Sequence, residues 1–146
     1  MNKILLILSL VLLASCSPKE VASGQLVERQ GIKYEVNSTT PFTGVVMDYH
    51  DNGQLKEKAN YKDGVMDGLF QAYHENAQLR MIGQFKDGKE YGLWELYHEN
   101  GQLRGKGNYK DGKFDGLLKG YHENGQVEYK DCYNNGEEVD MSYCEQ

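Results

Sequence analysis

The sequence predicts an all-β protein, a single-layer twisted antiparallel β-meander built from 24-residue β-hairpin repeats. Three observations predict it: one motif recurs at a constant period, glycine-containing turn pairs alternate with apolar segments, and no proline follows Pro41. A proline-free segment leaves every backbone N–H available for a strand ladder. Each repeat is therefore expected to contribute two strands and two turns.

The repeat is defined by a heptapeptide that starts at Tyr49, Tyr73, Tyr97 and Tyr121. A second motif, Tyr-Lys-Asp-Gly, starts at Tyr61 and recurs with the same period. Asn-Gly and Asp-Gly pairs favour hairpin turns because both central residues can take positive φ. Four copies tile residues 44–139, and Ala77 stands where the other copies have a turn glycine.

The second strand of each repeat alternates with period two. In the third copy, one face of this strand is predicted to carry Leu103, Gly105, Gly107 and Tyr109. The equivalent positions Ala59 and Gly83 are also small, so we expect large side chains from neighbouring strands to lie over this row. Phe70, Trp94 and the repeated tyrosines are the candidates for that role.

The first strand of each repeat has apolar residues on both of its faces. A single sheet cannot bury both faces by itself, so part of this surface is expected to stay exposed as a patch for a protein partner. The exposed edge strands offer a second route, the addition of a partner strand. The candidate binding face consists of Phe70, Tyr73, Trp94, Leu96 and Tyr97.

The segments outside the repeats differ from them. Residues 26–43 are predicted to form an irregular opening hairpin, and residues 16–25 a tether. From Glu123 onward there are seven acidic residues and one lysine, and residues 140–146 are predicted to form an acidic C-terminal cap. Charged side chains on an edge strand discourage pairing with other molecules. We therefore expect this end to terminate the sheet.

The N-terminus has the pattern of an export signal over residues 1–15. A lysine precedes an apolar stretch of ten residues, far shorter than the roughly 20 needed to cross a bilayer. The segment Leu13-Ala14-Ser15-Cys16 resembles the lipobox of bacterial lipoproteins, and this resemblance implies lipidation of Cys16. The alternative is an ordinary signal peptide that happens to end beside a cysteine.

The lipobox implies an exported protein anchored by lipid to the cell envelope, periplasmic or surface-exposed. Residue 17 is serine rather than the aspartate associated with inner-membrane retention, so sorting to the outer membrane is expected if the cell has one. Removal of the signal leaves 15 basic against 22 acidic side chains, a formal charge of −7. An acidic surface is repelled by nucleic acid, so no nucleic-acid partner is predicted.

The segments Tyr-His-Glu-Asn-Gly-Gln-Leu and Tyr-Lys-Asp-Gly-Lys-x-Asp-Gly-Leu-Trp resemble the bacterial variant of the MORN repeat, over residues 26 to about 140. Similar proteins are often labelled YwqK-like antitoxins. The predicted function is a membrane-anchored repeat module that binds a protein or envelope component. The alternatives are an antitoxin or immunity protein that masks a toxin, and a structural or adhesion protein of the envelope.

The repeated histidines invite a metal-binding hypothesis, because each neighbours a carboxylate. Equivalent positions lie two strands apart, roughly 9–10 Å, whereas metal–nitrogen bonds are about 2 Å. We therefore predict no metal site and expect solvated residues that flank turns, at His50, His74, His98 and His122.

No catalytic site or cofactor is predicted. Residues 44–141 contain neither serine nor threonine, so the repeats cannot assemble a hydroxyl-based triad. The carboxylates are repetitive, whereas an active site normally forms one special cluster. For Cys132 and Cys144 the sequence leaves two alternatives, a disulfide in an oxidising compartment or two free thiols.

Overall fold

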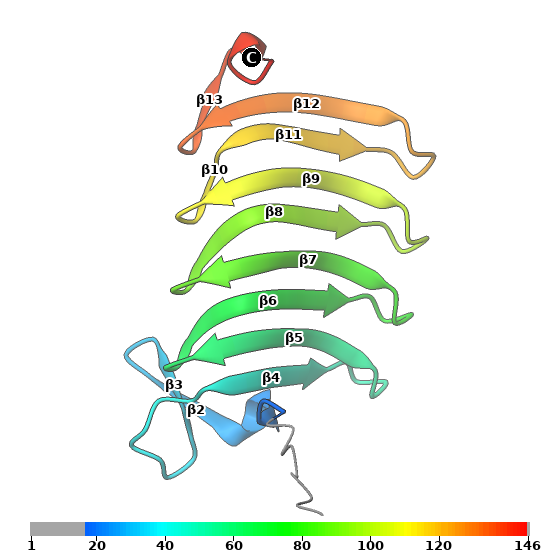
Figure 1. Ribbon diagram of the computed structural model, residues 1–146. Coiled ribbons are helices and arrows are strands. Elements are labelled where there is room, and N and C mark those ends of the chain that lie inside the picture. Colours follow the sequence, from blue (N-terminus) through cyan, green and yellow to red (C-terminus); the bar gives the residue numbers. More distant parts are fainter. Residues whose placement is uncertain (1–16, 146) are drawn as a thin grey trace, which may run out of the picture.

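The computed structural model describes residues 17–145. Within them the chain forms one 11-stranded, mostly antiparallel meander sheet and a small two-stranded sheet at its N-terminal end (Figure 1). The all-β fold class predicted from the repeats is confirmed. The predicted signal peptide and Cys16 lie outside the described residues. No helix in the described part is long and apolar enough to cross a membrane.

The repeats supply the strands of the meander, and almost every strand pairs with its neighbour in sequence. The strands are β4 (Gly44–Tyr49), β5 (Leu55–Lys62), β6 (Val65–Tyr73), β7 (Leu79–Lys86), β8 (Lys89–Tyr97), β9 (Leu103–Lys110), β10 (Lys113–Phe114), β11 (Gly116–Tyr121), β12 (Val127–Asn134) and β13 (Glu137–Val139).

The turns after β5, β7, β9 and β12 are tight two-residue hairpins. Asp63 and Gly64 have φ of 49° and 81°, and the other three pairs are similar. Positive φ at both positions matches the right-handed twist of the flanking strands. The Gly64 N–H also donates to the carbonyl of Phe42, and this bond recurs at each later copy. The predicted turn type is therefore observed along one edge of the sheet.

The turns at the other ends of the strands, after β4, β6, β8 and β11, differ from the prediction. The N–H of Gly53 donates to the carbonyl of His50 at 2.8 Å, and only the glycine has positive φ. The Asn52 side chain instead accepts from the N–H of Gln54 at 2.9 Å. An asparagine that bonds the backbone two residues on stabilises a longer turn. Ala77 takes the same conformation, with φ of 64°.

A β-bulge follows each of these longer turns. It reverses the face of the sheet to which the residue just before it in the strand projects. Tyr97 pairs with Leu103, whereas Leu96 pairs with Gly105, so Arg104 is the extra residue. Residues that face each other across a ladder project to the same side. Leu103 therefore projects to the side of Tyr97 and not, as predicted, with Gly105 and Gly107.

The N-terminal end of the sheet is closed by the segment predicted as a tether. Strand β1 (Glu20–Ala22) pairs with β4 in parallel, with Val21 beside Val46. A short 3-10 turn (η1, Ser23–Gln25) follows, and the Ser23 hydroxyl donates to Asp48 at 2.8 Å. That bond lowers the pKa of the Asp48 carboxyl below its usual range. The prediction of a tether reaching to residue 25 is wrong, because burial of Val21 fixes residues 20–22 in the sheet.

The opening hairpin consists of β2 (Leu26–Arg29) and β3 (Ile32–Glu35), which form the separate two-stranded sheet. It packs against the first tight turn, where the N–H of Lys33 donates to the carbonyl of Gly64 at 2.9 Å. The buried core lies here and consists of Val21, Phe42, Val46, Ala59 and Tyr61.

The C-terminal end is less complete. Strand β13 pairs with only the last three residues of β12, and a 3-10 turn follows (η2, Met141–Tyr143). A disulfide joins Cys132 to Cys144 and fastens this turn to β12. Of the two alternatives that the sequence left open, the structure has the bonded one.

Candidate functional site

The two faces of the sheet differ in chemistry. One, which we call the aromatic face, carries a continuous chain of rings along the strands. Ring centroids lie 5.7 Å apart for Phe70 and Trp94, 5.2 Å for Phe85 and Trp94, and 5.9 Å for Trp94 and Tyr109. Tyr109 lies 4.2 Å from Phe114. Because edge and tilted ring pairs are favourable, this chain stabilises the face without a second layer.

Glycines make room for these large side chains. The Trp94 ring lies directly over Gly83, where an added Cβ would collide with the indole. Over Gly107, an added Cβ would approach the Leu118 side chain to 2.9 Å. The predicted packing of large residues over a row of small ones is therefore observed, although the repeated tyrosines take no part in it.

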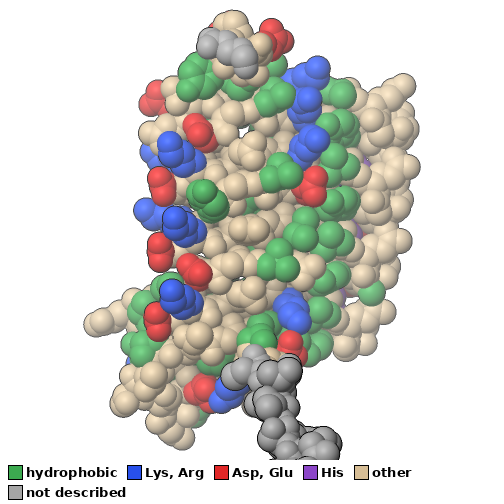
Figure 2. All heavy atoms as spheres, viewed as in Figure 1, with side chains coloured by type: hydrophobic (Ala, Val, Ile, Leu, Met, Phe, Trp, Pro, Cys, Tyr) green, Lys and Arg blue, Asp and Glu red, His purple; other side chains and the backbone are tan. Residues whose placement is uncertain are grey.

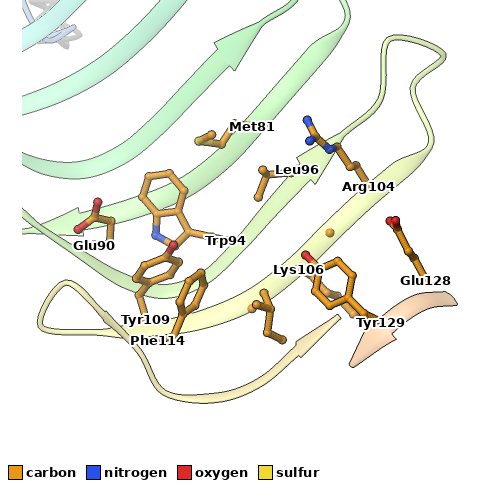
Figure 3. A pocket seen from close by; sticks show the side chains of 13 residues that line it. Met81, Glu90, Trp94, Leu96, Arg104, Lys106, Tyr109, Phe114, Glu128 and Tyr129 are labelled. Carbon is orange, nitrogen blue, oxygen red and sulfur yellow. The ribbon is translucent and has the colours of Figure 1, made fainter. Parts of the chain in front are cut away.

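A groove of about 640 Å³ lies on the aromatic face in the C-terminal half of the sheet (Figure 3). Its floor is β9, where Gly105 and Gly107 have no side chains. Strands β7 and β8 supply one wall, and β10, β11 and β12 the other. The apolar and aromatic residues that line the groove are Met81, Trp94, Leu96, Tyr109, Phe114, Leu118 and Tyr129.

Charged groups stand at the ends of this groove. Glu90 lies at the end beside Tyr109, and Arg104 and Glu128 lie at the other end (Figure 3). Burial raises the pKa of the Tyr109 phenol, and the nearby Glu90 carboxylate raises it further. The phenol therefore stays protonated and neutral at physiological pH. An apolar middle with charged ends suits recognition of a side chain or short segment.

The Trp94 indole contributes one unusual feature. Its side chain is 5% exposed, and its Nε1 has no hydrogen-bond partner among the residues that the structure describes. Leaving a buried donor unpaired costs roughly 1–3 kcal/mol. Trp94 therefore packs at the centre of the face for the area it buries and not for its polar atom.

The opposite face, here called the outer face, is more polar. It is turned toward the viewer in Figure 2, where charged side chains alternate near the tight turns and hydrophobic ones line the longer turns. Leu93 and Leu69 project there as isolated apolar residues, 50% and 40% exposed. The pocket beside Leu69 and Leu93 on this face is smaller than the groove of the aromatic face, about 190 Å³.

The predicted binding residues divide between the two faces. Phe70, Trp94 and Leu96 belong to the aromatic face, because they pair with Gly83, Gly107 and Gly105. Tyr73 and Tyr97 follow Ala72 and Leu96 at the bulges and project from the outer face. The five residues predicted as a binding face therefore do not share one face of the sheet.

Several groove residues were missed by the sequence analysis. Tyr109 was assigned to the packed row, and Phe114, Leu118 and Tyr129 received no role. The available signal was Gly105, which stands where the other repeats have Glu57, Met81 and Tyr129. A glycine at a position where the other repeats have larger side chains leaves the space above the strand unfilled. The groove floor lies at that position.

The histidines hold neighbouring repeats together. Nε2 of His50, His74 and His98 lies 2.8–3.0 Å from the carbonyl oxygens of Tyr73, Tyr97 and Tyr121, respectively. The expectation of solvated residues is wrong for these three, because the register of the repeats brings each turn beside the next. Among the described residues, no three His, Cys, Asp or Glu side chains cluster as a metal site would require.

Residues 42–63, 90–111 and 114–135 match the family model described as the MORN repeat variant. The second and third matches follow each other by one repeat period, and the first and second are two periods apart, so the segment from residue 66 is one further copy. No curated protein shows significant similarity to the chain.

Two solved structures show distant similarity. One is a mutant of S. aureus TarM in complex with Fondaparinux, alpha-GlcNAc-glycerol and UDP, with 13% identity and a TM-score of 0.39 over 79% of this chain. The other is a GtfA/B complex bound to UDP and GlcNAc, with 10% identity and a TM-score of 0.33 over 75% of it. The chain covers only 21% and 23% of those proteins.

Similarity at this level assigns no function. The three matched segments, their common period and the hairpin meander agree with one another. The chain is a protein of MORN-variant repeats, a kind of module consistent with a binding or structural role.

Proposed function

We propose that this protein is a membrane-anchored, non-catalytic repeat module that binds a protein or envelope component through the groove on its aromatic face. The observation that carries the proposal is the groove itself, about 640 Å³ in volume with aromatic walls and a glycine floor. Clefts of this size, lined by apolar side chains with few polar groups, are typical binding sites.

The chemistry of the groove favours binding over catalysis. Glu90 is separated from Arg104 and Glu128 by the apolar middle, so these three groups do not converge on one point. Lys106, the fourth charged residue of the lining, pairs with Glu95 and belongs to the outer face. The repeats contain no serine or threonine, and the two described cysteines are bonded to each other. Tryptophan and tyrosine are enriched among the few residues that contribute most of the affinity at protein interfaces.

The proposed anchor is a lipid on Cys16. Strand β1 begins only four residues later, at Glu20, and it lies on the N-terminal edge of the sheet. Adjacent strands are about 4.8 Å apart, so the groove floor at β9, five strands beyond β4, lies about 25 Å farther from the anchor. A lipid at Cys16 would therefore hold the groove above the membrane surface, within reach of a partner outside the bilayer.

The groove assignment can be tested by crosslinking the protein in intact envelopes and recovering its partners. Leu96→Glu places a charge in the groove, whereas Leu93→Glu places one on the outer face of the same strand. We expect Leu96→Glu to abolish a specific adduct that Leu93→Glu retains. Loss with Leu93→Glu alone would contradict the assignment. Identification of the partner as a toxin would favour the antitoxin alternative.

The anchor is tested separately by metabolic labelling with palmitate. The wild-type protein is expected to take up the label and to fractionate with membranes. Cys16→Ala is expected to remove the label and to leave the protein unprocessed or released. An unlabelled wild-type protein would refute the anchor but leave the groove assignment intact.

A further inference from the structure

At the C-terminal end of the sheet, the outer edge of β12 is only partly covered. Strand β13 pairs with residues 132–134 of β12, and the segment Val127–Asp131 has no strand on its outer side within the described chain. Residues 127–130 are all exposed. Unpaired N–H and C=O groups along a strand are a template for another strand.

The protein's own chain would reach this edge if the repeat continued. Asp140 stands one repeat period after Gly116, at the position where Gly44, Gly68, Gly92 and Gly116 begin or continue a strand. All four glycines have positive φ, whereas Asp140 has φ of −59° and caps η2. The disulfide to Cys132 then holds Cys144 in the turn. The segment that would cover β12 is therefore folded away from it.

Side-chain donors at this edge also lack the partners that their counterparts have. In each earlier repeat, the asparagine of the longer turn donates to a carbonyl of the next repeat, as Asn76 does to Glu99 at 2.9 Å. Asn124 bonds only Gln126 of its own turn, at 3.4 Å. The ring of His122 has no hydrogen-bond partner among residues 17–145, although the rings of the three other histidines each have one.

The charge at this edge breaks the repeat pattern in a specific way. Asp131 stands at the position of Ala59, Gly83 and Gly107, which lie opposite or beneath a large side chain of the following strand. Glu128 stands at the position of Lys56, Arg80 and Arg104. A strand added to β12 in the register of the repeats would therefore meet a carboxylate where an apolar residue is met elsewhere. Lysine or arginine is the complementary residue there.

We infer that the open edge of β12 binds an extended strand of a protein partner that carries lysine or arginine opposite Asp131. The register of the earlier repeats also places a partner residue opposite Lys130, at the position that Glu95 takes opposite Ile82. The recognised pattern is thus a cation followed by an acid along the added strand. This inference rests on the proposed binding role and adds a second surface beside the groove.

The experiment uses a peptide with the sequence of β8, residues 89–97, carrying Trp94→Arg, and a matched peptide with Trp94→Glu. Each is titrated into the isotope-labelled protein with its disulfide intact, and backbone amide shifts are followed by NMR. We expect the arginine peptide to bind at least about tenfold more tightly, with shifts confined to residues 122–131. Asp131→Asn should remove most of this preference, whereas Glu99→Gln in an exposed turn should leave it unchanged.

Methylation of the peptide amides tests the mode of binding. Only every second amide of an added strand faces the protein. One alternate set of N-methyl groups should therefore abolish binding, and the other set should be tolerated. Binding of both peptides with equal affinity, tolerance of both methylated sets, absence of binding, or shifts outside residues 122–131 would each overturn the inference.

The proposal for the groove and the inference about the β12 edge can be refuted independently by these experiments. Leu96→Glu is expected to leave peptide binding at β12 unchanged, and Asp131→Asn is expected to leave the groove adduct unchanged. If only the peptide fails to bind, the inference about the β12 edge is therefore wrong. If only the groove adduct is absent, the proposed function is wrong.

Discussion

The two ends of the sheet are built differently although the same repeat forms both. At the N-terminal end, β1 covers Val45–Met47 of β4, the β2–β3 hairpin packs beside the first tight turn, and Phe42 and Val46 are almost completely buried. At the C-terminal end, β13 covers only part of β12, and Cys132 is the buried hydrophobic residue of that strand.

The difference indicates that the two ends of the sheet have different roles, one in stability and the other in binding. A repeat array is stabilised by contacts between neighbouring repeats and needs special segments at its ends. The closed end supplies a cluster of buried hydrophobic residues, whereas Ala72 and Trp94 are buried singly in the interior of the sheet. The C-terminal half, with thinner packing, carries the groove and the open edge, the two surfaces available to partners.

The largest effect is expected at the closed end. Phe42 is 2% exposed and packs against Tyr61 with ring centroids 6.5 Å apart. Phe42→Ala should destabilise the protein by about 3–5 kcal/mol, as for other buried aromatics. Tyr133→Ala, at the partly exposed end of the ring chain, should cost less than half as much. Urea denaturation of both variants measures the difference, and equal losses would remove the distinction between the ends.

The next effect concerns the disulfide that fastens the open end. It closes a short loop, with a sequence separation of 12 residues. Cys144→Ser should lower the free energy of unfolding by about 2–3 kcal/mol, largely by relaxing a constraint on the unfolded chain. Hydrogen exchange should show the loss of protection in β12 and β13 but not in β4 and β5. Faster exchange throughout the sheet would show that the two ends do not lose protection independently of each other.

Much of the fold could be predicted from the sequence because it is repeated. The constant period locates the strands and turns from β4 to β13, and four copies make chance agreement improbable. Strand β1 could not be predicted, since Glu-Val-Ala has no counterpart in the repeat and pairs through a contact distant in sequence. Its position depends on burial of Val21 beside Val46.

The candidate site was predicted only in part. Alternation of apolar residues assigned Trp94 and the small residues beneath its row to one face. The pattern contains no sign of the bulge at Arg104, so Leu103 was placed on the side of Gly105 and Gly107 without the change of side that the bulge produces. A one-residue irregularity reverses every side chain beyond it, and only the backbone geometry reveals it.

A smaller effect tests whether the repeats between the two ends are equivalent. Ala77 and Gly101 occupy the same turn position with φ of 64° and 81°. Gly101→Ala should destabilise by roughly 1 kcal/mol, because a Cβ is strained at positive φ. Ala77→Gly should be neutral or stabilising by about 0.5 kcal/mol, after the extra entropy of glycine offsets part of the gain. A clearly destabilising Ala77→Gly together with a harmless Gly101→Ala, both followed by urea denaturation, would show that the turns are not equivalent.

The smallest effect is a pH dependence at the closed end. Burial first, and then the Glu28 and Glu57 carboxylates, raise the pKa of Tyr61 above its ordinary value near 10. The folded state therefore holds this proton more tightly than the unfolded state. Its contribution to stability is complete below pH 10 and decreases as the pH rises through the folded pKa. Tyr61→Phe should lessen the decline above pH 10 in urea midpoints, and an unchanged profile would contradict this role.

Photo-crosslinking on living cells tests most directly whether the aromatic face is the binding surface. A photoreactive side chain is placed at Leu96, in the groove, and in a second protein at Leu93, on the outer face three residues earlier on the same strand. The account predicts a discrete adduct from position 96 and none from position 93. An adduct from position 93 alone, or equal adducts from both, would contradict it.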